Sequence, residues 1–205
     1  MVFDYFANTV GLDDRAAVYQ KYDFLVAVVA DGAGGMSGAS EAADYFLQSV
    51  LQKISTEVRD IMDHTYWYQV LAEIDELLYK HPIAGETTGI IAAFNTNNNC
   101  IVGASVGDSE AYIISNKYCC LTEHQYRKPL LGSGAAIPIP FGPITVDGTI
   151  ILGSDGLFKY TSLSKISQII QYNHPKESVL RLFDLVKLPN GIFMDDVSVV
   201  VVNPL

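Results

Sequence analysis

The sequence predicts an α+β protein in which two antiparallel β-sheets pack face to face and helices cover their outer sides. Apolar runs of strand length occur near the start, in the middle and at the end of the chain. Two helical patterns separate the first strands from the middle ones, and two more precede the last strand. The chain has no repeat, no low-complexity tract and no obvious linker, so we expect residues 1–205 to form a single domain.

The first part of the chain predicts three strands. Alternation at Val2–Phe6 predicts the first strand, Asn8–Asp14 is a polar loop, and Arg15–Tyr19 predicts the second strand. Phe24–Ala30 is an unbroken, valine-rich apolar run that is too short for a typical helix. Such a run is typical of a strand buried on both faces, and we expect the rest of the fold to be organised around it.

Two helices are expected next. From Ala39 to Ile61, Val58 included, apolar residues recur every three or four positions, which predicts a long helix with one apolar face. Trp67–Leu78 repeats this pattern and predicts a second helix. His64 lies between the two patterns and is expected to be an exposed connector residue.

Strand patterns return in the middle of the chain. Thr87–Phe94 and Cys100–Val106 predict a hairpin that is closed by the polar turn Asn95–Asn99. Ala111–Ser115 and Tyr118–Leu121 predict two further strands. We expect these four strands to form an antiparallel meander.

The last third of the chain mixes irregular segments with regular ones. Leu130–Pro143 is rich in Gly and Pro and predicts an irregular loop. Asp147-Gly148 predicts a two-residue hairpin turn between the strands Ile144–Val146 and Thr149–Leu152. The remaining predicted elements are two helices, Ser162–Tyr172 and Lys176–Val186, and a final buried strand, Val197–Val202.

The composition fits a protein with a sizeable core and argues against several classes of partner. Of the 205 residues, 49% are hydrophobic, and the formal net charge at pH 7 is −10. Such an acidic surface disfavours nucleic acids and anionic membranes as partners. Cys100, Cys119 and Cys120 lack the spacing of a disulfide framework or a zinc site and are expected to be reduced. A signal-like start and an apolar stretch of membrane-spanning length are both absent from the sequence, so we expect a cytoplasmic protein.

Carboxylates recur at the predicted strand ends, several of them beside glycine. A carboxylate at the mouth of a buried strand is costly to desolvate unless a positive charge meets it. If these strand ends converge, the cluster requires divalent cations, and all-oxygen ligands favour Mg²⁺ or Mn²⁺ over zinc. Taken singly, Asp31-Gly32 and Asp13-Asp14 favour ordinary turns, and only the repetition of carboxylates at several strand ends favours a metal site. The carboxylates concerned are Asp13, Asp14, Asp31, Asp108, Asp155, Asp195 and Asp196.

Six short segments, in order, resemble the motifs of the type-2C metal-dependent Ser/Thr protein phosphatases and cover nearly the whole chain. The resemblance implies a four-layer α-β-β-α sandwich with a binuclear Mn²⁺/Mg²⁺ centre in a cleft at one end of the sheets. The segments are DGAGG at 31–35, ETTG at 86–89, VGDSEAY at 106–112, LTEHQ at 121–125, GSDGLF at 153–158 and DDVSVVVV at 195–202.

The resemblance also implies a role for each matching residue. Asp31 would bridge both metals, and the Gly32 carbonyl would bind one of them. Asp155 and Asp195 would hold the first metal, and Asp13 the second, directly or through water. Asp14 would order metal-bound water, so the residues implied to act in catalysis are Asp14, Asp31 and Asp155. Asp108 would bind a more labile third metal, and Asp196 remains an alternative to Asp195 because the family usually has Asn there.

The chain departs from the family pattern at several positions. Thr9 and Val10 occupy the region where the family often has a phosphate-binding arginine, and Arg15 is the nearest cation that could replace it. Glu110 stands where the family usually has arginine. Ala33 replaces a histidine of eukaryotic members, which points to a bacterial-type enzyme.

The segment after Leu121 is also short for the family, and Pro129–Pro143 is compact, which predicts an open cleft suited to a protein substrate. His81, His124 and His174 are expected to lie at the surface or behind the ligands.

The predicted function is hydrolysis of phosphoserine and phosphothreonine in proteins by a metal-activated water, without a covalent phosphoenzyme. Two alternatives remain open. The chain could be a catalytically weak binding module, because the clamp arginine is missing and Glu110 replaces the usual arginine. It could also be a phosphatase of small phosphomonoesters. The expected partners are a phosphorylated protein substrate and a cognate Ser/Thr kinase, and the chain is expected to be a monomer.

Overall fold

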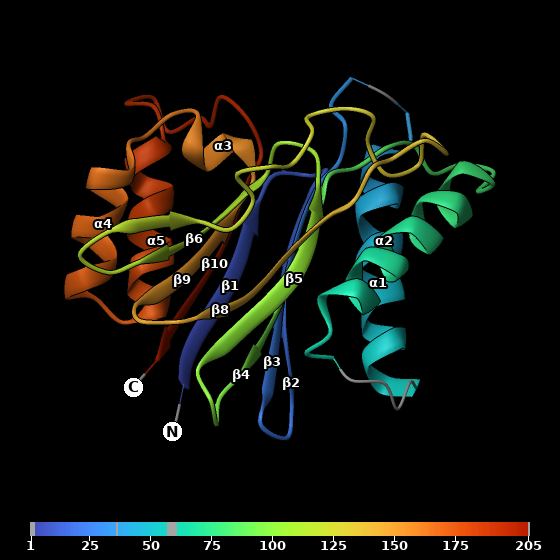
Figure 1. Cartoon of the computed structure of the whole chain (residues 1–205). Coiled ribbons are helices and arrows are strands. Elements are labelled where there is room, and N and C mark those ends of the chain that lie inside the picture. The colour runs from blue at the N-terminus through green and yellow to red at the C-terminus, as the bar shows by residue number, and fades with distance from the viewer. Residues whose placement is uncertain (1–2, 36, 57–60, 205) are drawn as a thin grey trace.

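The computed structural model describes residues 3–35, 37–56 and 61–204, and it contains two antiparallel sheets with helices on both outer sides (Figure 1). The strands are β1 (Phe3–Val10), β2 (Asp14–Lys21), β3 (Phe24–Asp31), β4 (Gly89–Asn95), β5 (Cys100–Val106), β6 (Glu110–Ile114), β7 (Tyr118–Cys120), β8 (Ile139–Thr145), β9 (Thr149–Gly153) and β10 (Val197–Pro204). The helices are α1 (Ala39–Thr56), α2 (His64–Tyr79), α3 (Asp155–Phe158), α4 (Leu163–Tyr172) and α5 (Pro175–Val186).

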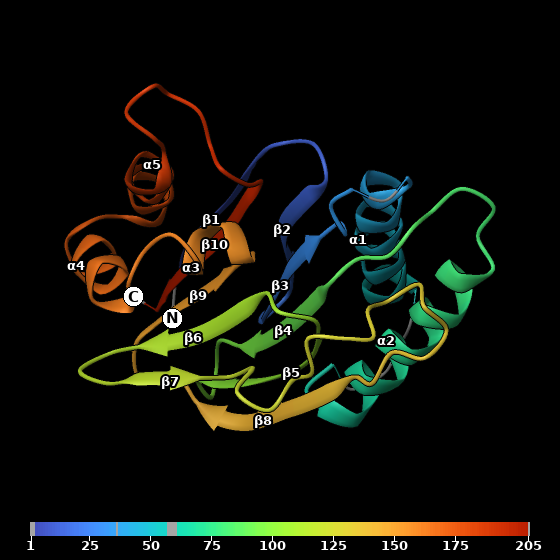
Figure 2. The ribbon, with the colours of Figure 1, turned by 90° about the horizontal axis from the view of Figure 1, so that it is seen from above.

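Each sheet has five strands. One sheet has the order β1-β10-β9-β6-β7 and the other the order β2-β3-β4-β5-β8, and every paired strand is antiparallel to its neighbour. Helices α4 and α5 cover the first sheet, whereas α1 and α2 cover the second (Figures 1 and 2). The α-β-β-α sandwich predicted from the sequence is therefore confirmed. Among the described helices, none is long and apolar enough to cross a membrane.

Strand β3 explains why this chain folds as four layers. Leu25, Ala27 and Val29 point into the space between the two sheets, where they pack with residues such as Val200 of β10. The alternate residues of β3 belong to a second apolar cluster, beneath α1 and α2, in which Trp67 is fully buried. The unbroken apolar run from Phe24 to Ala30 is therefore required, because each face of the strand is covered.

The segment around β1 differs from the sequence-based prediction of a polar loop at residues 8–14. Asn8, Thr9 and Val10 instead continue β1 and pair with β10, where Thr9 lies opposite Ser198. The polar side chain of Thr9 is accommodated because its hydroxyl bonds to the Ser198 hydroxyl at 2.6 Å. Only residues 11–13 connect the two sheets at this point.

The helical region also requires a correction. His64 is the first residue of α2 and not a connector, because Asp63 caps the helix by accepting the Thr65 N–H at 2.9 Å. Helix α1 is described as far as Thr56, so the predicted contribution of Val58 lies outside the described residues, as does that of Val2 to the first strand.

Two predicted strand pairings are wrong. The hairpin at Asp147-Gly148 does not exist, because β8 pairs with β5 in one sheet while β9 pairs with β6 and β10 in the other. The meander is interrupted in the same way, since residues 107–109 cross from β5 in the second sheet to β6 in the first. Part of the predicted loop Leu130–Pro143 is strand β8, an edge strand, where proline is tolerated.

Candidate active site

Acidic residues from separate parts of the chain meet at one end of the sandwich. Asp31 at the end of β3, Asp108 after β5, Asp155 at the start of α3 and Asp195 before β10 line one cavity of about 500 Å³. Figure 2 shows this end of the molecule from above, with α3 beside the ends of β9 and β10. The convergence on which the sequence-based hypothesis depends is present in the structure.

Asp14 and Asp31 form the most buried part of the cluster. They are register partners on the neighbouring strands β2 and β3, and only 1% of Asp14 is exposed. Burial raises the pKa of Asp14 to about 7 and that of Asp31 to about 9, and repulsion between the two carboxylates adds to the shift of Asp31. With both pKa values raised, the pair retains a proton near neutral pH when no cation is bound.

The two threonines of the ETTG segment fix the backbone of Asp31. The Thr88 hydroxyl accepts the Asp31 N–H at 3.0 Å, and the Thr87 hydroxyl donates to the Asp31 carbonyl at 3.0 Å. The Thr88 hydroxyl also pairs with that of Ser109 at 2.7 Å, which ties Asp31 to the loop carrying Asp108. Because both threonines are buried, these bonds hold Asp31 at a fixed place at the mouth of the cavity.

Gly32 allows the loop after β3 to pack closely against its surroundings. A Cβ atom at this position would lie 2.6 Å from the Ala39 carbonyl oxygen and 2.8 Å from the Asp13 carbonyl oxygen. The Gly32 N–H donates to that same Asp13 carbonyl at 3.2 Å. The glycine is therefore required by packing, and the metal-binding role implied for its own carbonyl stays a prediction.

Two cations neutralise part of the cluster, and none of the sequence motifs indicated a role for either. Lys159 Nζ lies 3.5 Å from Asp155 Oδ2 and 3.6 Å from Asp195 Oδ2. Arg127 Nη2 lies 2.6 Å from Asp108 Oδ2. The ion pair of Lys159 with Asp155 could have been predicted from the sequence, because Lys159 follows Asp155 by four residues at a helix. No local sequence pattern indicates the ion pair of Arg127 with Asp108.

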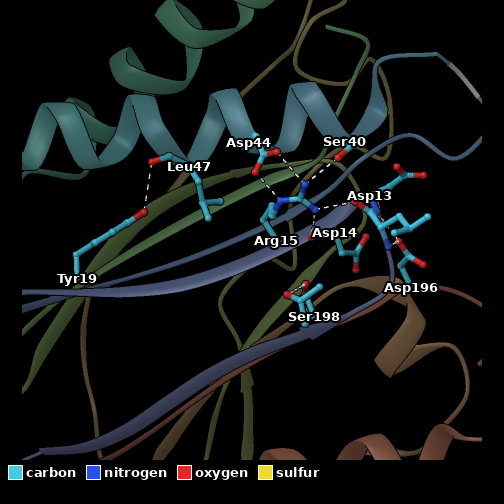
Figure 3. A network of polar contacts seen from close by, with 11 residues as sticks. Asp13, Asp14, Arg15, Tyr19, Ser40, Asp44, Leu47, Asp196 and Ser198 are labelled. Atoms are coloured by element: carbon cyan, nitrogen blue, oxygen red, sulfur yellow. Dashed lines mark hydrogen bonds and ion pairs between the residues drawn. The ribbon is translucent and has the colours of Figure 1, made fainter.

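Asp195 and Asp196 have different positions. The Asp196 carboxylate accepts the backbone N–H groups of Leu12 and Asp13 at 2.7 and 2.6 Å, so it holds the β1–β2 loop (Figure 3). Gly11, with φ of +122°, has no room for a side chain because a Cβ atom would overlap this carboxylate. Asp195 lines the cavity instead, which makes it the better candidate ligand of the two.

Arg15 does not face the cavity. Its guanidinium donates to both carboxylate oxygens of Asp44, to the Ser40 hydroxyl and to the carbonyls of Leu12 and Asp14, at 2.5 to 2.8 Å (Figure 3). These bonds use all five N–H donors of an arginine and join β2 to α1. A role for Arg15 as the phosphate clamp, left open by the sequence, is not compatible with this arrangement.

The side chains of Asp13 and Asp14 point in different directions (Figure 3). Only Asp14 lies opposite Asp31, while the backbone of Asp13 bonds to Asp196 and Gly32. The ligand role implied for Asp13 stays a prediction.

The donor set fits hard divalent cations such as Mn²⁺ or Mg²⁺. Asp14 Oδ2 is buried and has no hydrogen-bond partner within the described part of the chain, which is costly for a carboxylate oxygen. The neighbouring donors are carboxylate oxygens as well, and these ions prefer oxygen ligands. As the side chains stand, no three Asp, Glu, His or Cys residues among those described form a ready-made metal site, so side-chain rotation would accompany binding.

The fold and this acidic centre define the class of the molecule: a two-sheet α-β-β-α sandwich with carboxylates gathered at one end of the sheets. Comparison with solved structures identifies the same class. A bacterial serine phosphatase matches with a TM-score of 0.81 and 16% identity over 100% of this chain and 98% of that one. Stp1 from Staphylococcus aureus matches with a TM-score of 0.76 and 16% identity over 98% and 94% of the two chains.

A third similar structure contains bound metal ions. The catalytic domain of the serine/threonine protein phosphatase PstP, in complex with two manganese ions, matches with a TM-score of 0.73 and 20% identity over 98% of this chain and 97% of that one. No family model and no curated protein matches the sequence. The chain therefore has the fold of the bacterial Ser/Thr phosphatases, as the resemblance to the type-2C family predicted.

Proposed function

We propose that this chain is a metal-dependent phosphatase that hydrolyses phosphoserine and phosphothreonine in proteins. The observation that carries the proposal is the pair Asp14 and Asp31, of which Asp14 is buried behind Asp31, while Asp31 lines a cavity together with three further aspartates. A chain without metal chemistry would have no reason to keep ionisable groups together at this cost in stability. The similarity to bacterial serine/threonine phosphatases, one of them with two bound manganese ions, supports the same activity.

The residues present suggest how the ions would be held. Asp31, Asp155 and Asp195 are the candidate ligands of the first ion, with Asp31 shared with a second, and Asp108 is the candidate for a third. When bound, Mn²⁺ or Mg²⁺ would supply positive charge beside the phosphoryl oxygens and lower the pKa of a coordinated water.

The chain's own residues would position the reactants. The Asp14 carboxylate, held beside Asp31, would accept a hydrogen bond from the attacking water and orient it toward phosphorus. Arg127 and Lys128 line the cavity and can meet the phosphate oxygens of the substrate. Ala33 lines the cavity too and has no proton to donate, so the leaving serine or threonine oxygen takes its proton from water. Hydrolysis then yields the free hydroxyl side chain and inorganic phosphate.

The wall of the cavity next to Arg127 is fixed to the body of the protein. Asp75 of α2 accepts the N–H groups of Gly132, Gly134 and Ala136 at 2.7 to 3.0 Å, and the connection between β7 and β8 runs along α2 (Figure 2). Leu131 adds a backbone bridge to Thr87. This compact wall supports a cleft that admits a phosphorylated segment of another protein. The enzyme that phosphorylates this substrate in the cell would be a Ser/Thr kinase.

The proposal is tested by hydrolysis of p-nitrophenyl phosphate and of a phosphothreonine peptide with and without Mn²⁺. We expect Mn²⁺-dependent release of phosphate from both, and its loss in Asp31→Asn and Asp155→Asn, with Asp184→Asn at an exposed position of α5 as the matched control. Mn²⁺-dependent peptide binding without turnover would indicate a binding module instead. Turnover of sugar phosphates or nucleotides that exceeds turnover of the peptide would indicate a phosphatase of small molecules.

A further inference from the structure

A second groove adjoins the acidic cavity and has no role in the chemistry described above. It has a volume of about 500 Å³ and shares Asp108, Arg127 and Asp155 with the cavity. The start of β6, the end of β7 and the end of α3 form its walls. A peptide whose phosphate occupies the cavity must therefore place one of its flanking residues in or beside this groove, if the proposed function is correct.

The charges in the groove are unevenly distributed. The cations Arg127 and Lys159 lie at the shared end, where they pair with aspartates of the cavity. Glu110 and Glu123 also line the groove, and within the described residues neither forms an ion pair with Lys, Arg or His. The part of the groove away from the phosphate thus carries uncompensated negative charge.

Glu110 is held in place without being neutralised. The hydroxyl of Tyr112 donates to Glu110 Oε2, and the ring of Tyr112 packs against Phe158 with 5.3 Å between ring centroids. A carboxylate fixed by a neutral donor keeps its full charge for a ligand.

The groove also offers apolar surface. Phe158 and Cys120 line the groove together with Glu110 and Glu123. A lysine or arginine side chain combines an apolar stem with a cationic head and matches such a surface at both ends. A neutral side chain matches only the apolar part of the groove, and an acidic side chain matches neither part.

We propose that this groove binds a Lys or Arg side chain that flanks the phosphorylated serine or threonine, so that the preferred substrates are basic phosphopeptides. The inference rests on the proposed function and adds to it a class of substrate. Glu110 and Glu123 are the specificity-determining residues. The net charge of −10 attracts such a basic segment from a distance.

The test compares phosphothreonine peptides that differ only in having Arg, Ala or Glu on either side of the phosphothreonine. In the presence of Mn²⁺, kcat/KM should be highest for the Arg peptide and lowest for the Glu peptide. Because a partly exposed ion pair is worth little, we expect the Arg peptide to exceed the Ala peptide by about fivefold. The result is expressed as the ratio of kcat/KM for the Arg peptide to kcat/KM for the Ala peptide. This ratio cancels any general loss of activity in a variant.

Glu110→Gln and Glu123→Gln should each bring the ratio toward one, and Glu110→Arg should reverse the preference. Glu76→Gln is the matched control, since it removes the same charge from an exposed ion pair with Lys80 on α2, and it should leave the ratio unchanged. A ratio near one in the wild type, or one that both Glu variants leave unaltered, overturns the inference.

A binding measurement separates this inference from the proposed function. If the wild type releases no phosphate from p-nitrophenyl phosphate or from any peptide, the proposed function is overturned. Fluorescence anisotropy with the same peptides carrying a non-hydrolysable phosphonate then decides the role of the groove. Tighter binding of the Arg peptide that is lost in Glu110→Gln supports it, and equal binding of all three peptides overturns it.

Discussion

Asp14 and Asp31 lie directly opposite one another on the adjacent strands β2 and β3, and only 1% of Asp14 is exposed. Like charges at such a cross-strand position destabilise a sheet. Because both pKa values are raised, the pair retains a proton when no counter-ion is bound, and this links the stability of the metal-free protein to pH.

The metal-free protein should lose stability as the pH rises. The pKa values of Asp14, about 7, and Asp31, about 9, lie above the ordinary value of 3.8. A carboxyl group with a raised pKa in the folded state binds its proton more tightly there than in the unfolded state. Its contribution to the free energy of unfolding is therefore constant below about pH 4. That contribution declines as the pH rises through the folded-state pKa.

Asp31→Asn removes the free-energy cost of ionising Asp31 in the folded state. It should therefore raise the Tm of the metal-free protein at pH 8 by about 5 °C, equivalent to about 2 kcal/mol. At pH 5 the variant and the wild type should differ much less. Thermal melts in EDTA across this pH range check both statements. Asp184→Asn provides the control, and a difference between Asp31→Asn and the wild type that does not depend on pH would contradict the argument.

The sequence was sufficient to locate the acidic residues, because each lies at the end of a strand whose apolar pattern is local. Strand β3 is the clearest case, since its apolar run Phe24–Ala30, directly before Asp31, requires cover on both faces. The partners of β8 and β9 could not be predicted, because pairing depends on contacts between residues far apart in the chain. For the same reason the sequence could not show that Asp196 binds the Leu12 loop or that Arg127 reaches Asp108.

Divalent cations should reverse the pH dependence. Because Mn²⁺ binds ionised carboxylates, it should stabilise the protein more at pH 8 than at pH 5. At a Mn²⁺ concentration of about 100 times the Kd, linkage gives about 2.7 kcal/mol, or a rise in Tm of about 5–10 °C. Excess EDTA should abolish the rise. An equal Mn²⁺ effect in wild type, Asp31→Asn and Asp155→Asn would show that the ion binds elsewhere.

The neighbours Asp195 and Asp196 should respond differently to substitution. Asp196→Ala leaves the backbone N–H groups of Leu12 and Asp13 without an acceptor, so it should lower the Tm of the metal-free protein, at a cost of about 1–3 kcal/mol. Asp195→Ala should have little effect on the metal-free Tm but should weaken the stabilisation by Mn²⁺. Melting curves of both variants with and without Mn²⁺ separate the two roles, and the opposite pattern would make Asp196 the ligand.

Thr88 should act through the position of Asp31. Thr88→Val preserves the shape of the side chain but removes the acceptor for the Asp31 N–H and the partner of the Ser109 hydroxyl. We expect a loss of about 1–3 kcal/mol in stability and a fall in kcat of about tenfold or more. Thr88→Ser keeps the hydroxyl and should retain most of the stability and most of the kcat of the wild type. If the two variants behave alike, the hydroxyl network does not position Asp31.

Arg127 should contribute to phosphate binding in place of the arginine that is missing near Thr9. It lines the cavity with its side chain 79% exposed, and it uses Nε and Nη2 toward Asp108. Within the described residues nothing is bonded to Nη1, so this group can meet a phosphate oxygen. Arg127→Met should therefore raise KM for a phosphothreonine peptide by about tenfold, a typical effect of losing a charged hydrogen bond, with a smaller change in kcat.

Inhibition by inorganic phosphate distinguishes this role from a merely structural one. If Arg127 binds phosphate, Arg127→Met should weaken that inhibition in parallel with the rise in KM, and Arg127→Lys should restore it in part, because lysine keeps the charge but loses the planar fork. Arg181→Met, which removes an arginine paired with Glu177 on α5, is the matched control. Should Arg127 only hold Asp108 in place, Arg127→Met would change the response to Mn²⁺ and leave inhibition by phosphate as it is in the wild type.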